Sequence, residues 1–160
     1  MTPDPASYRT VLGHFATGVT VITAIDDGQP VGMAANSFTS VSLDPPLVLF
    51  CAAKTSSTWP QIERSGKFAV NILGEHQEDV CRVFAQKGED RFARTGYRKS
   101  LMGSPLLPDV IAYLDCTIHA VHDAGDHVVV IGHVEDLGVG AEGVGGPLLF
   151  YRGGYAKLAL

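Results

Sequence analysis

Short apolar segments rich in β-branched residues recur along most of this chain, and turn-forming residues separate them. The segments are 19–25, one resuming at 31, a loosely alternating one at 36–43, then 47–52, 68–73, 111–121, 127–137 and 148–152. The clearest separators are Asp26-Asp27-Gly28, Asp44-Pro45-Pro46 and the tight turn at 123–126. Many strands at short spacing favour a mostly antiparallel β-barrel over a doubly wound α/β fold.

Helices are expected to be few, short and peripheral. The first is predicted to begin at Asp4-Pro5 and to stop near Gly18. Its apolar stripe at helical spacing consists of Tyr8, Val11, Leu12 and Phe15. A second helix should follow the hydroxyl-rich residues 55–58 and end at Gly66, and a third should cover 75–85. Residues 86–108 are expected to be irregular.

Size and composition exclude several classes of protein. A chain of 160 residues predicts one domain, covering 1–160. The net charge of −5 gives no basic surface for nucleic acid. No apolar run approaches the ~20 residues needed to span a bilayer, and the first ten residues lack a secretion signal, so a cytoplasmic location is expected. Hydrophobic residues make up 46% of the chain and the mean hydropathy is +0.15, which favours burial of apolar surface against a second subunit.

The three cysteines, Cys51, Cys81 and Cys116, are odd in number and have no CxxC spacing. The sequence therefore indicates buried thiols rather than disulfides or a thiolate metal site. Four histidines between 119 and 133 raise the question of zinc, but no HExxH motif accompanies them, and strand alternation does not bring them together. No metal site is predicted.

A hydroxyl cluster precedes the second expected helix. Ser56, Ser57 and Thr58 follow a buried strand, and Lys54 lies just upstream. Free N–H groups at a helix start stabilise an anion, and a lysine adds charge, so a phosphate would suit this position. Plain helix capping, which needs only one hydroxyl, explains the same residues.

A small-residue segment, Gly32 to Phe38, offers a wall for a flat ligand. Alanines allow close approach, while Asn36 and Ser37 can bond the polar edge of a ring. A flavin needs this mixture of apolar surface and amide donors. An ordinary strand crossing explains the segment equally well when it is considered alone.

His127 follows Gly125 and Asp126 at the expected start of a strand, where a histidine can orient a nicotinamide or donate a proton. A structural histidine is the alternative. Residues 138–143 match GxGxxG after a strand, but a further strand follows instead of a helix, so the Rossmann interpretation is rejected in favour of a mobile glycine loop. A serine-hydrolase GxSxG elbow is also missing.

Taken together, the ordered motifs resemble the short-chain NAD(P)H:flavin oxidoreductases, the reductase partners of two-component flavin-dependent monooxygenases. The motifs are FATGVTVIT at 15–23, NSFTSVSLDPP at 36–46, GKFAVNIL at 66–73, GDH at 125–127 and PLLFYRGGY at 147–155. The similarity covers nearly the whole chain. It is strongest to the reductases that serve aromatic-ring and secosteroid hydroxylation in bacteria.

The resemblance implies an FMN-binding split β-barrel, a homodimer with flavin near the subunit interface, and reduced flavin that diffuses to the oxygenase. It implies that the flavin ring and ribityl chain contact Ala34, Ala35, Asn36, Ser37, Phe38 and Ser40, with Cys51, Ala52 and Ala53 behind them. The phosphate would contact Ser56, Ser57 and Thr58, and Phe84 and Ala85 would close the site. Phe150, Tyr151, Arg152 and Gly153 would meet the nicotinamide beside the catalytic His127.

Alternatives remain at this point. FMN and FAD are both open, and NADH is favoured over NADPH because Arg152 is the single basic residue near the expected nicotinamide site. A non-catalytic flavin- or haem-binding split barrel is the second interpretation, and it would need no nicotinamide site. An enzyme like pyridoxamine-phosphate oxidase is the third, but the basic cluster that its substrate requires is not evident.

Overall fold

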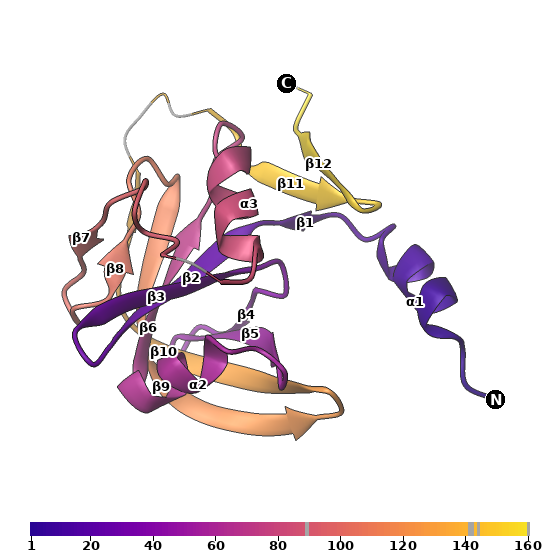
Figure 1. Ribbon diagram of the computed structural model, residues 1–160, viewed down its shortest axis with the longest axis horizontal. Coiled ribbons are helices and arrows are strands. Elements are labelled where there is room, and N and C mark those ends of the chain that lie inside the picture. The colour runs from indigo at the N-terminus through magenta and orange to yellow at the C-terminus, as the bar shows by residue number, and fades with distance from the viewer. Residues whose placement is uncertain (89, 141–142, 144, 160) are drawn as a thin grey trace.

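The computed structural model describes residues 1–88, 90–140, 143 and 145–159, and within them it shows three short helices and twelve strands (Figure 1). The helices are α1 (Pro5–Leu12), α2 (Trp59–Ser65) and α3 (Glu78–Ala85). The strands are β1 (Thr17–Gly18), β2 (Thr20–Asp26), β3 (Gln29–Ala35), β4 (Thr39–Ser42), β5 (Leu47–Ala53), β6 (Lys67–Ile72), β7 (Arg98–Lys99), β8 (Pro105–Leu106), β9 (Ala112–Ala124), β10 (His127–Val139), β11 (Leu148–Tyr151) and β12 (Gly154–Lys157). The mostly β fold with short peripheral helices is as predicted.

One large antiparallel sheet organises the molecule. Its seven strands run in the order β3-β2-β6-β9-β10-β5-β4. The sheet curls so that β3 and β5 come into contact, although β3 lies at one edge and β4 at the other. The result is a barrel that is split between β3 and β5. A second sheet of β1, β11 and β12 and a two-stranded hairpin of β7 and β8 flank it.

The turn between β2 and β3 shows how local sequence sets the register. Asp27 and Gly28 have φ angles of 51° and 77°, and two positive φ values are what the tight turn of a two-residue hairpin requires. Asp26 therefore pairs with Gln29, and the register runs unbroken to Thr20 opposite Ala35. This register places the end of β3, the expected flavin wall, beside the start of β2.

Strand β2 is buried on both faces, which ties the two halves of the core together. Ile22 and Ala24 pack into the barrel interior with Phe50 and Phe68. Val21, on the opposite face, packs in a second cluster beneath α3. Phe84 of α3 belongs to that second cluster, and it packs so close to Gly32 of β3 that a Cβ on Gly32 would lie 2.9 Å from its ring. Glycine at this position lets α3 rest directly on β3.

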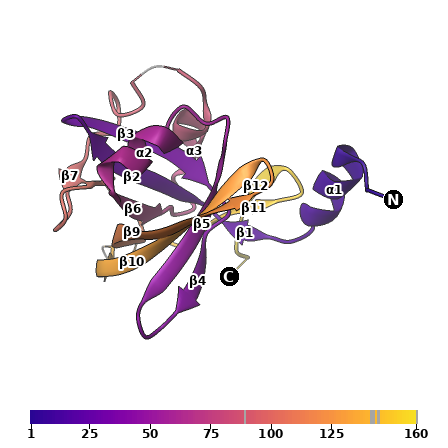
Figure 2. The same ribbon diagram turned by 90° about the horizontal axis from the view of Figure 1, so that it is seen from below.

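Helix α1 stands apart from the barrel in both views (Figures 1 and 2). Asp4 caps it as predicted, since its Oδ1 accepts a hydrogen bond from the Ser7 N–H over 2.9 Å. The predicted end near Gly18 is wrong, because Thr17 and Gly18 pair with β11 and the helix ends at Leu12. None of its residues is buried, so its apolar stripe faces outward. No helix in the described part of the chain is long and apolar enough to cross a membrane.

The C-terminal region is richer in strands than expected. The expected strand at 148–152 ends at Tyr151 as β11, and β12 returns against it. Residues 86–108, expected to be irregular, contain the short β7–β8 hairpin. In the GxGxxG segment, Gly138 and Val139 still belong to β10. Residues 141–142 of that segment lie outside the described residues, so the mobile glycine loop stays a prediction.

Candidate functional site

A cavity of about 620 Å³ opens at the split between β3 and β5. Its volume falls within the roughly 300–1,000 Å³ typical of small-molecule sites. The lining comes from the end of β3, the end of β5, the loop before α2, the end of α3, the loop after it and the start of β10. The residues are Met33, Ala34, Ala35, Asn36, Ser37, Cys51, Ala53, Thr55, Ser56, Ser57, Thr58, Phe84, Ala85, Lys87, Arg91 and His127. Most of the site residues expected from the sequence therefore meet in one place.

Strand alternation decides which β5 residues reach this cavity. Cys51 and Ala53 line it, and they pair with Val129 and His127 of β10. Ala52 points to the opposite face and is fully buried in the barrel core. Of the three residues expected behind the flavin, Ala52 is thus the one whose side chain does not line the cavity, because successive side chains on a strand face opposite ways.

The segment after β3 supplies a free amide and a constrained hydroxyl. Ser37 Oγ accepts a hydrogen bond from the Cys51 N–H over 2.9 Å and donates one to the Cys51 carbonyl oxygen over 3.1 Å. That hydroxyl thus joins the segment to β5. The Asn36 side chain makes no hydrogen bond to any residue that the structure describes, so its amide is available to a ligand. Ala34 and Ala35 form the small-residue wall beside it.

The hydroxyls of the cluster before α2 have different roles: one bonds the backbone, and the others are available to the cavity. Ser56 Oγ accepts hydrogen bonds from the Thr58 N–H over 3.2 Å and the Trp59 N–H over 3.1 Å. The sequence argument for free N–H groups at this helix start is therefore wrong for those two groups. Ser57 makes no side-chain hydrogen bond within the described residues, and Thr58 is buried. Hydroxyls, rather than the seven-residue helix, face the cavity here.

Positive charge at this end of the cavity comes from residues that sequence reasoning missed. Lys54 was expected to supply it, but its Nζ lies 3.2 Å from Asp123 Oδ1 and it does not line the cavity. Lys87 and Arg91, from the segment after α3, do line it. Partial burial lowers the pKa of Arg91. The sequence feature that could have revealed them is the pair of basic residues at 87 and 91, in a segment expected to be irregular.

His127 lies at the other side of the cavity as the first residue of β10. Its Nδ1 lies 2.8 Å from Asp126 Oδ1, and this hydrogen bond lowers the pKa of the Asp126 carboxyl. When Nδ1 donates to a carboxylate, the neutral ring keeps Nε2 as an acceptor, which can orient a carboxamide. The side chain is thus placed to touch a second ligand beside the one in the cavity.

A smaller cavity of about 210 Å³ adjoins the main one and shares the wall of Ala34, Ala35, Asn36 and Ala85. Phe150 and Tyr155, whose ring centroids lie 5.4 Å apart, complete it with Val19 and Cys81. Tyr155 Oη lies 3.2 Å from Cys81 Sγ. Burial, reinforced by this contact, raises the pKa of Tyr155 to about 12.

Other expected site residues lie elsewhere in the single chain. Arg152 and Gly153 line a separate pocket with Arg9 and His14, at the junction with α1. Tyr151 packs edge-on against His14, with 6.4 Å between ring centroids. Phe38 lines a further pocket with Phe15, and Ser40 is exposed on β4. One chain therefore does not bring Arg152 and Gly153 into the cavity that contains His127.

Among the residues that the structure describes, no group of three or more His, Cys, Asp or Glu side chains is arranged to hold a metal ion. All three cysteines are free thiols, and Cys81 and Cys116 are buried as predicted.

The split barrel and this set of groups define a flavin-binding protein of the split-barrel class. The model of the flavin reductase like domain matches residues 12–159. A flavin reductase of Pseudomonas putida is 52% identical over 98% of this chain and 91% of its own. The reductase subunit HsaB of a flavin-dependent monooxygenase from Rhodococcus jostii is 53% identical over 97% of this chain and 78% of its own.

A solved structure adds a comparison in three dimensions. The NADH:FAD oxidoreductase SgcE6 of Streptomyces globisporus, in complex with NAD and FAD fragments, matches with a TM-score of 0.91 and 36% identity, over 99% of this chain and 97% of that one. The chain belongs to the flavin-reductase-like family and is an NAD(P)H-dependent flavin oxidoreductase.

Proposed function

We propose that this flavin reductase is the reductase component of a two-component monooxygenase, using NADH to reduce FMN or FAD and releasing the reduced flavin to a separate oxygenase. The observation that carries the proposal is the 620 Å³ cavity, with a free amide on one wall and hydroxyls and cations at one end. The names of the relatives support the oxygenase partner, because HsaB is a reductase subunit of such a system.

The residues present fit a flavin. Ala34 and Ala35 would lie against the ring system, and the amide of Asn36 would bond its polar edge. Ser57 and Thr58, with Lys87 and Arg91, would hold the phosphate. The bound flavin supplies the acceptor for a hydride from the nicotinamide, and the protein contributes alignment of the two rings.

His127 is assigned the role of catalytic residue at the nicotinamide. Its contact with Asp126 fixes the ring. In the neutral ring Nε2 would orient the carboxamide of NADH, and in the protonated ring it would donate a proton to the reduced flavin. Phe150 and Tyr155 in the adjoining cavity would contact the remaining face of the cofactor. We favour NADH because the cavities beside His127 contain no arginine cluster for a 2′-phosphate among the described residues.

A homodimer is proposed from the surface of α1. Val11 of the helix is 68% exposed, Phe15 just after the helix is 75% exposed, and no residue of the helix is buried. An apolar stripe of this kind gains free energy when a partner covers it. A second copy would also account for the separation of Arg152 from His127 in one chain, if the partner's hairpin completes the nicotinamide site.

Three free thiols fit a reducing compartment, so the proposed location is the cytoplasm, where NADH is available. The chain is proposed to act as one domain, because the core clusters on the two faces of β2 join all the major strands.

The test is a turnover assay with NADH or NADPH against FMN, FAD and riboflavin, following loss of the absorbance of the reduced nicotinamide. We expect NADH oxidation that depends on added flavin, and loss of the flavin on dialysis because it acts as a diffusing substrate. A protein that retains flavin through dialysis and oxidises no nicotinamide would instead be a storage or sensing protein, and the proposal would be wrong.

A further inference from the structure

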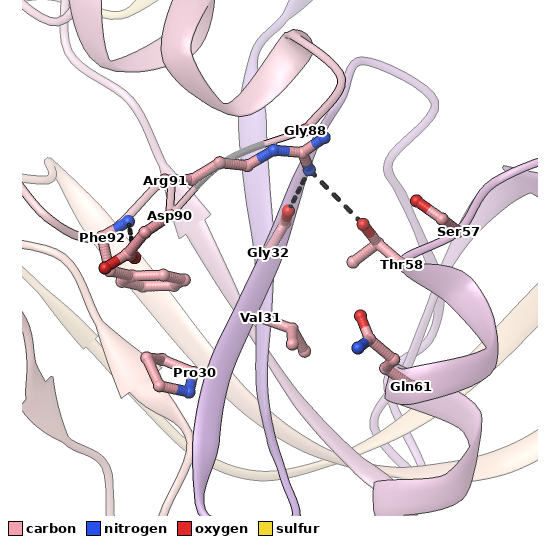
Figure 3. Close-up of a pocket in the computed structure, with 10 residues that line it drawn as sticks. All are labelled: Pro30, Val31, Gly32, Ser57, Thr58, Gln61, Gly88, Asp90, Arg91 and Phe92. Atoms are coloured by element: carbon pink, nitrogen blue, oxygen red, sulfur yellow. Dashed lines mark hydrogen bonds between the residues drawn. The ribbon is translucent and has the colours of Figure 1, made fainter.

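Another cavity, called the second cavity below, adjoins the end of the main cavity that carries the hydroxyls and cations. It is distinct from the cavity lined by Phe150 and Tyr155. Its volume is about 180 Å³, and it shares Ser57, Thr58 and Arg91 with the main cavity. Its other walls come from β3, α2 and the segment after α3 (Figure 3). The shared residues show that the two cavities are neighbours with one common boundary.

Arg91 lies at the boundary between the two. Its Nη1 donates to the Gly32 carbonyl oxygen over 2.5 Å and to Thr58 Oγ1 over 3.4 Å, and Nη2 donates to the Gln86 carbonyl oxygen. Figure 3 shows the side chain crossing from its loop towards β3 and α2. The Nε atom is buried and has no hydrogen-bond partner.

The guanidinium makes no ion pair with any carboxylate among the described residues, although Asp90 precedes it in sequence. A partly buried cation without a counter-charge costs free energy, and an anionic ligand would compensate it. A cation that lines both cavities and pairs with no described carboxylate thus favours a phosphate group between them.

The remaining walls of the second cavity combine apolar surface with few polar groups. Pro30, Val31 and Phe92 provide the apolar part, and Gln61 provides an amide. In Figure 3 the Val31 and Gln61 side chains face the same space. This lining suits a purine, which needs apolar contact with its faces and a hydrogen bond to its edge.

Asp90 adds a restriction on the ligand. Its Oδ1 accepts a hydrogen bond from the Phe92 N–H over 3.0 Å, which leaves Oδ2 as a further acceptor. A carboxylate repels phosphate but accepts hydrogen bonds from a ribose hydroxyl or an exocyclic amine. The second cavity therefore fits a nucleoside better than a second phosphate.

We propose that the two cavities form one extended site for FAD, in which the diphosphate lies against Arg91 and the adenosine half occupies the second cavity. The inference rests on the proposed function, because it places the flavin ring in the main cavity. FMN would end at Ser57 and Thr58 and leave the second cavity empty. The chain should accordingly bind FAD more tightly than FMN.

The test measures the affinity of the full chain for FAD, FMN and riboflavin by quenching of flavin fluorescence, without nicotinamide. Gln61→Trp fills the second cavity from α2, and Glu63→Trp on an exposed position of the same helix is the matched control. We expect Gln61→Trp to weaken FAD by roughly tenfold or more, as overlap with a ligand group would, while FMN and riboflavin are unaffected. The control should leave all three affinities unchanged.

Arg91→Ala tests the contribution of the positive charge separately from the contribution of the second cavity's shape. Loss of a charge-assisted bond should weaken FMN and FAD by about tenfold or more and spare riboflavin, which has no phosphate. A thermal melt detects loosening of the segment after α3, which would weaken the binding of FAD, FMN and riboflavin alike. Equal loss of FAD and FMN in Gln61→Trp, or equal affinity of the unchanged chain for FAD and FMN, would overturn the inference. Failure of every flavin to bind the unchanged chain would overturn the proposed function itself.

Discussion

The Nδ1 atom of His127 lies 2.8 Å from Asp126 Oδ1 at the edge of the main cavity. Further along β10, His133 makes a bond of the same length to Glu135. Both histidines occupy the same face of the strand, as its alternating burial shows. Only the first of them lines the main cavity, so only His127 is proposed to contact the nicotinamide.

His127→Ala should lower kcat/KM for NADH by about tenfold, the effect of losing one hydrogen bond of average strength. Flavin affinity should change less than the kinetics with NADH, because His127 is assigned to the nicotinamide and other side chains are assigned to the flavin phosphate. His133→Ala is the control and should retain the original kinetics. Steady-state kinetics with varied NADH, combined with flavin titrations, checks both, and unchanged kinetics for His127→Ala would refute its assigned role.

Ser56→Ala should destabilise the protein by about 1–3 kcal/mol, because it removes the acceptor of two backbone N–H groups. The serine Oγ accepts hydrogen bonds from the N–H groups of Thr58 and Trp59, just before and at the start of α2. Ser57→Ala, in the same loop, removes no described hydrogen bond and should leave the free energy of unfolding unchanged. Urea unfolding without flavin gives the comparison, and equal losses would contradict the structural role assigned to Ser56.

Asn71→Leu should be among the most destabilising single substitutions, at about 3 kcal/mol, because it leaves buried polar groups unpaired. The buried amide donates to the Val21 carbonyl oxygen and Thr23 Oγ1, and it accepts from the Leu107 N–H over 2.8 Å. The network fastens the segment before β9 to the sheet. Urea unfolding measures the loss, with Asn36→Leu as a partly exposed comparison, and a similar loss in both would refute the network's importance.

Stability should fall at alkaline pH because of Tyr155. Burial, with a contact from Cys81, raises the pKa of its phenol to about 12, above its ordinary value of 10.0. A raised pKa in the folded state gives stability that is complete below about pH 10 and is lost as pH rises towards about 12. Tyr155→Phe should flatten this decline, whereas Tyr8→Phe should preserve it. Unfolding midpoints of both variants are measured across that pH range, and an equal decline in the two would contradict the role of Tyr155.

The double substitution Val11→Asp and Phe15→Asp should convert the proposed homodimer into a monomer. Both side chains are exposed in the single chain, so the fold of each subunit should survive. Light scattering after size exclusion gives the mass, and circular dichroism checks the fold. Thr10→Asp, at an exposed position on the same helix, serves as the control. A dimer that persists in the double variant would place the interface elsewhere.

Much of the fold followed from local sequence. Asp27 and Gly28 predicted the tight turn that the structure shows, and the apolar segments at 47–52 and 127–137 predicted strands that pair as β5 and β10. The small-residue segment at 34–37 and the hydroxyls at 56–58 were found because backbone chemistry limits what such residues do. These features depend on neighbours in the chain, which the sequence shows directly.

Other features depended on contacts between distant segments. Periodicity alone continued the first helix towards Gly18, but pairing of Thr17 with Phe150 converts that stretch into β1. Sequence proximity made Lys54 the expected cation, whereas Asp123 engages it from across the hairpin turn. Propensity cannot predict either outcome, because tertiary pairing outweighs preferences of a few tenths of a kcal/mol per residue.

The sequence by itself determined a mostly antiparallel β-barrel, a small-residue segment, a hydroxyl cluster and a histidine at a strand start, since each follows from short-range patterns. The split in the barrel and the flavin were implied by the resemblance to flavin reductases. Only the tertiary structure decided that Ala52 faces the core, that Ser56 accepts the Trp59 N–H, and that Arg91 lies at the boundary of two cavities. The physical reason is that the direction of a side chain and the charge around it are set by what packs against it, and those partners come from far along the chain.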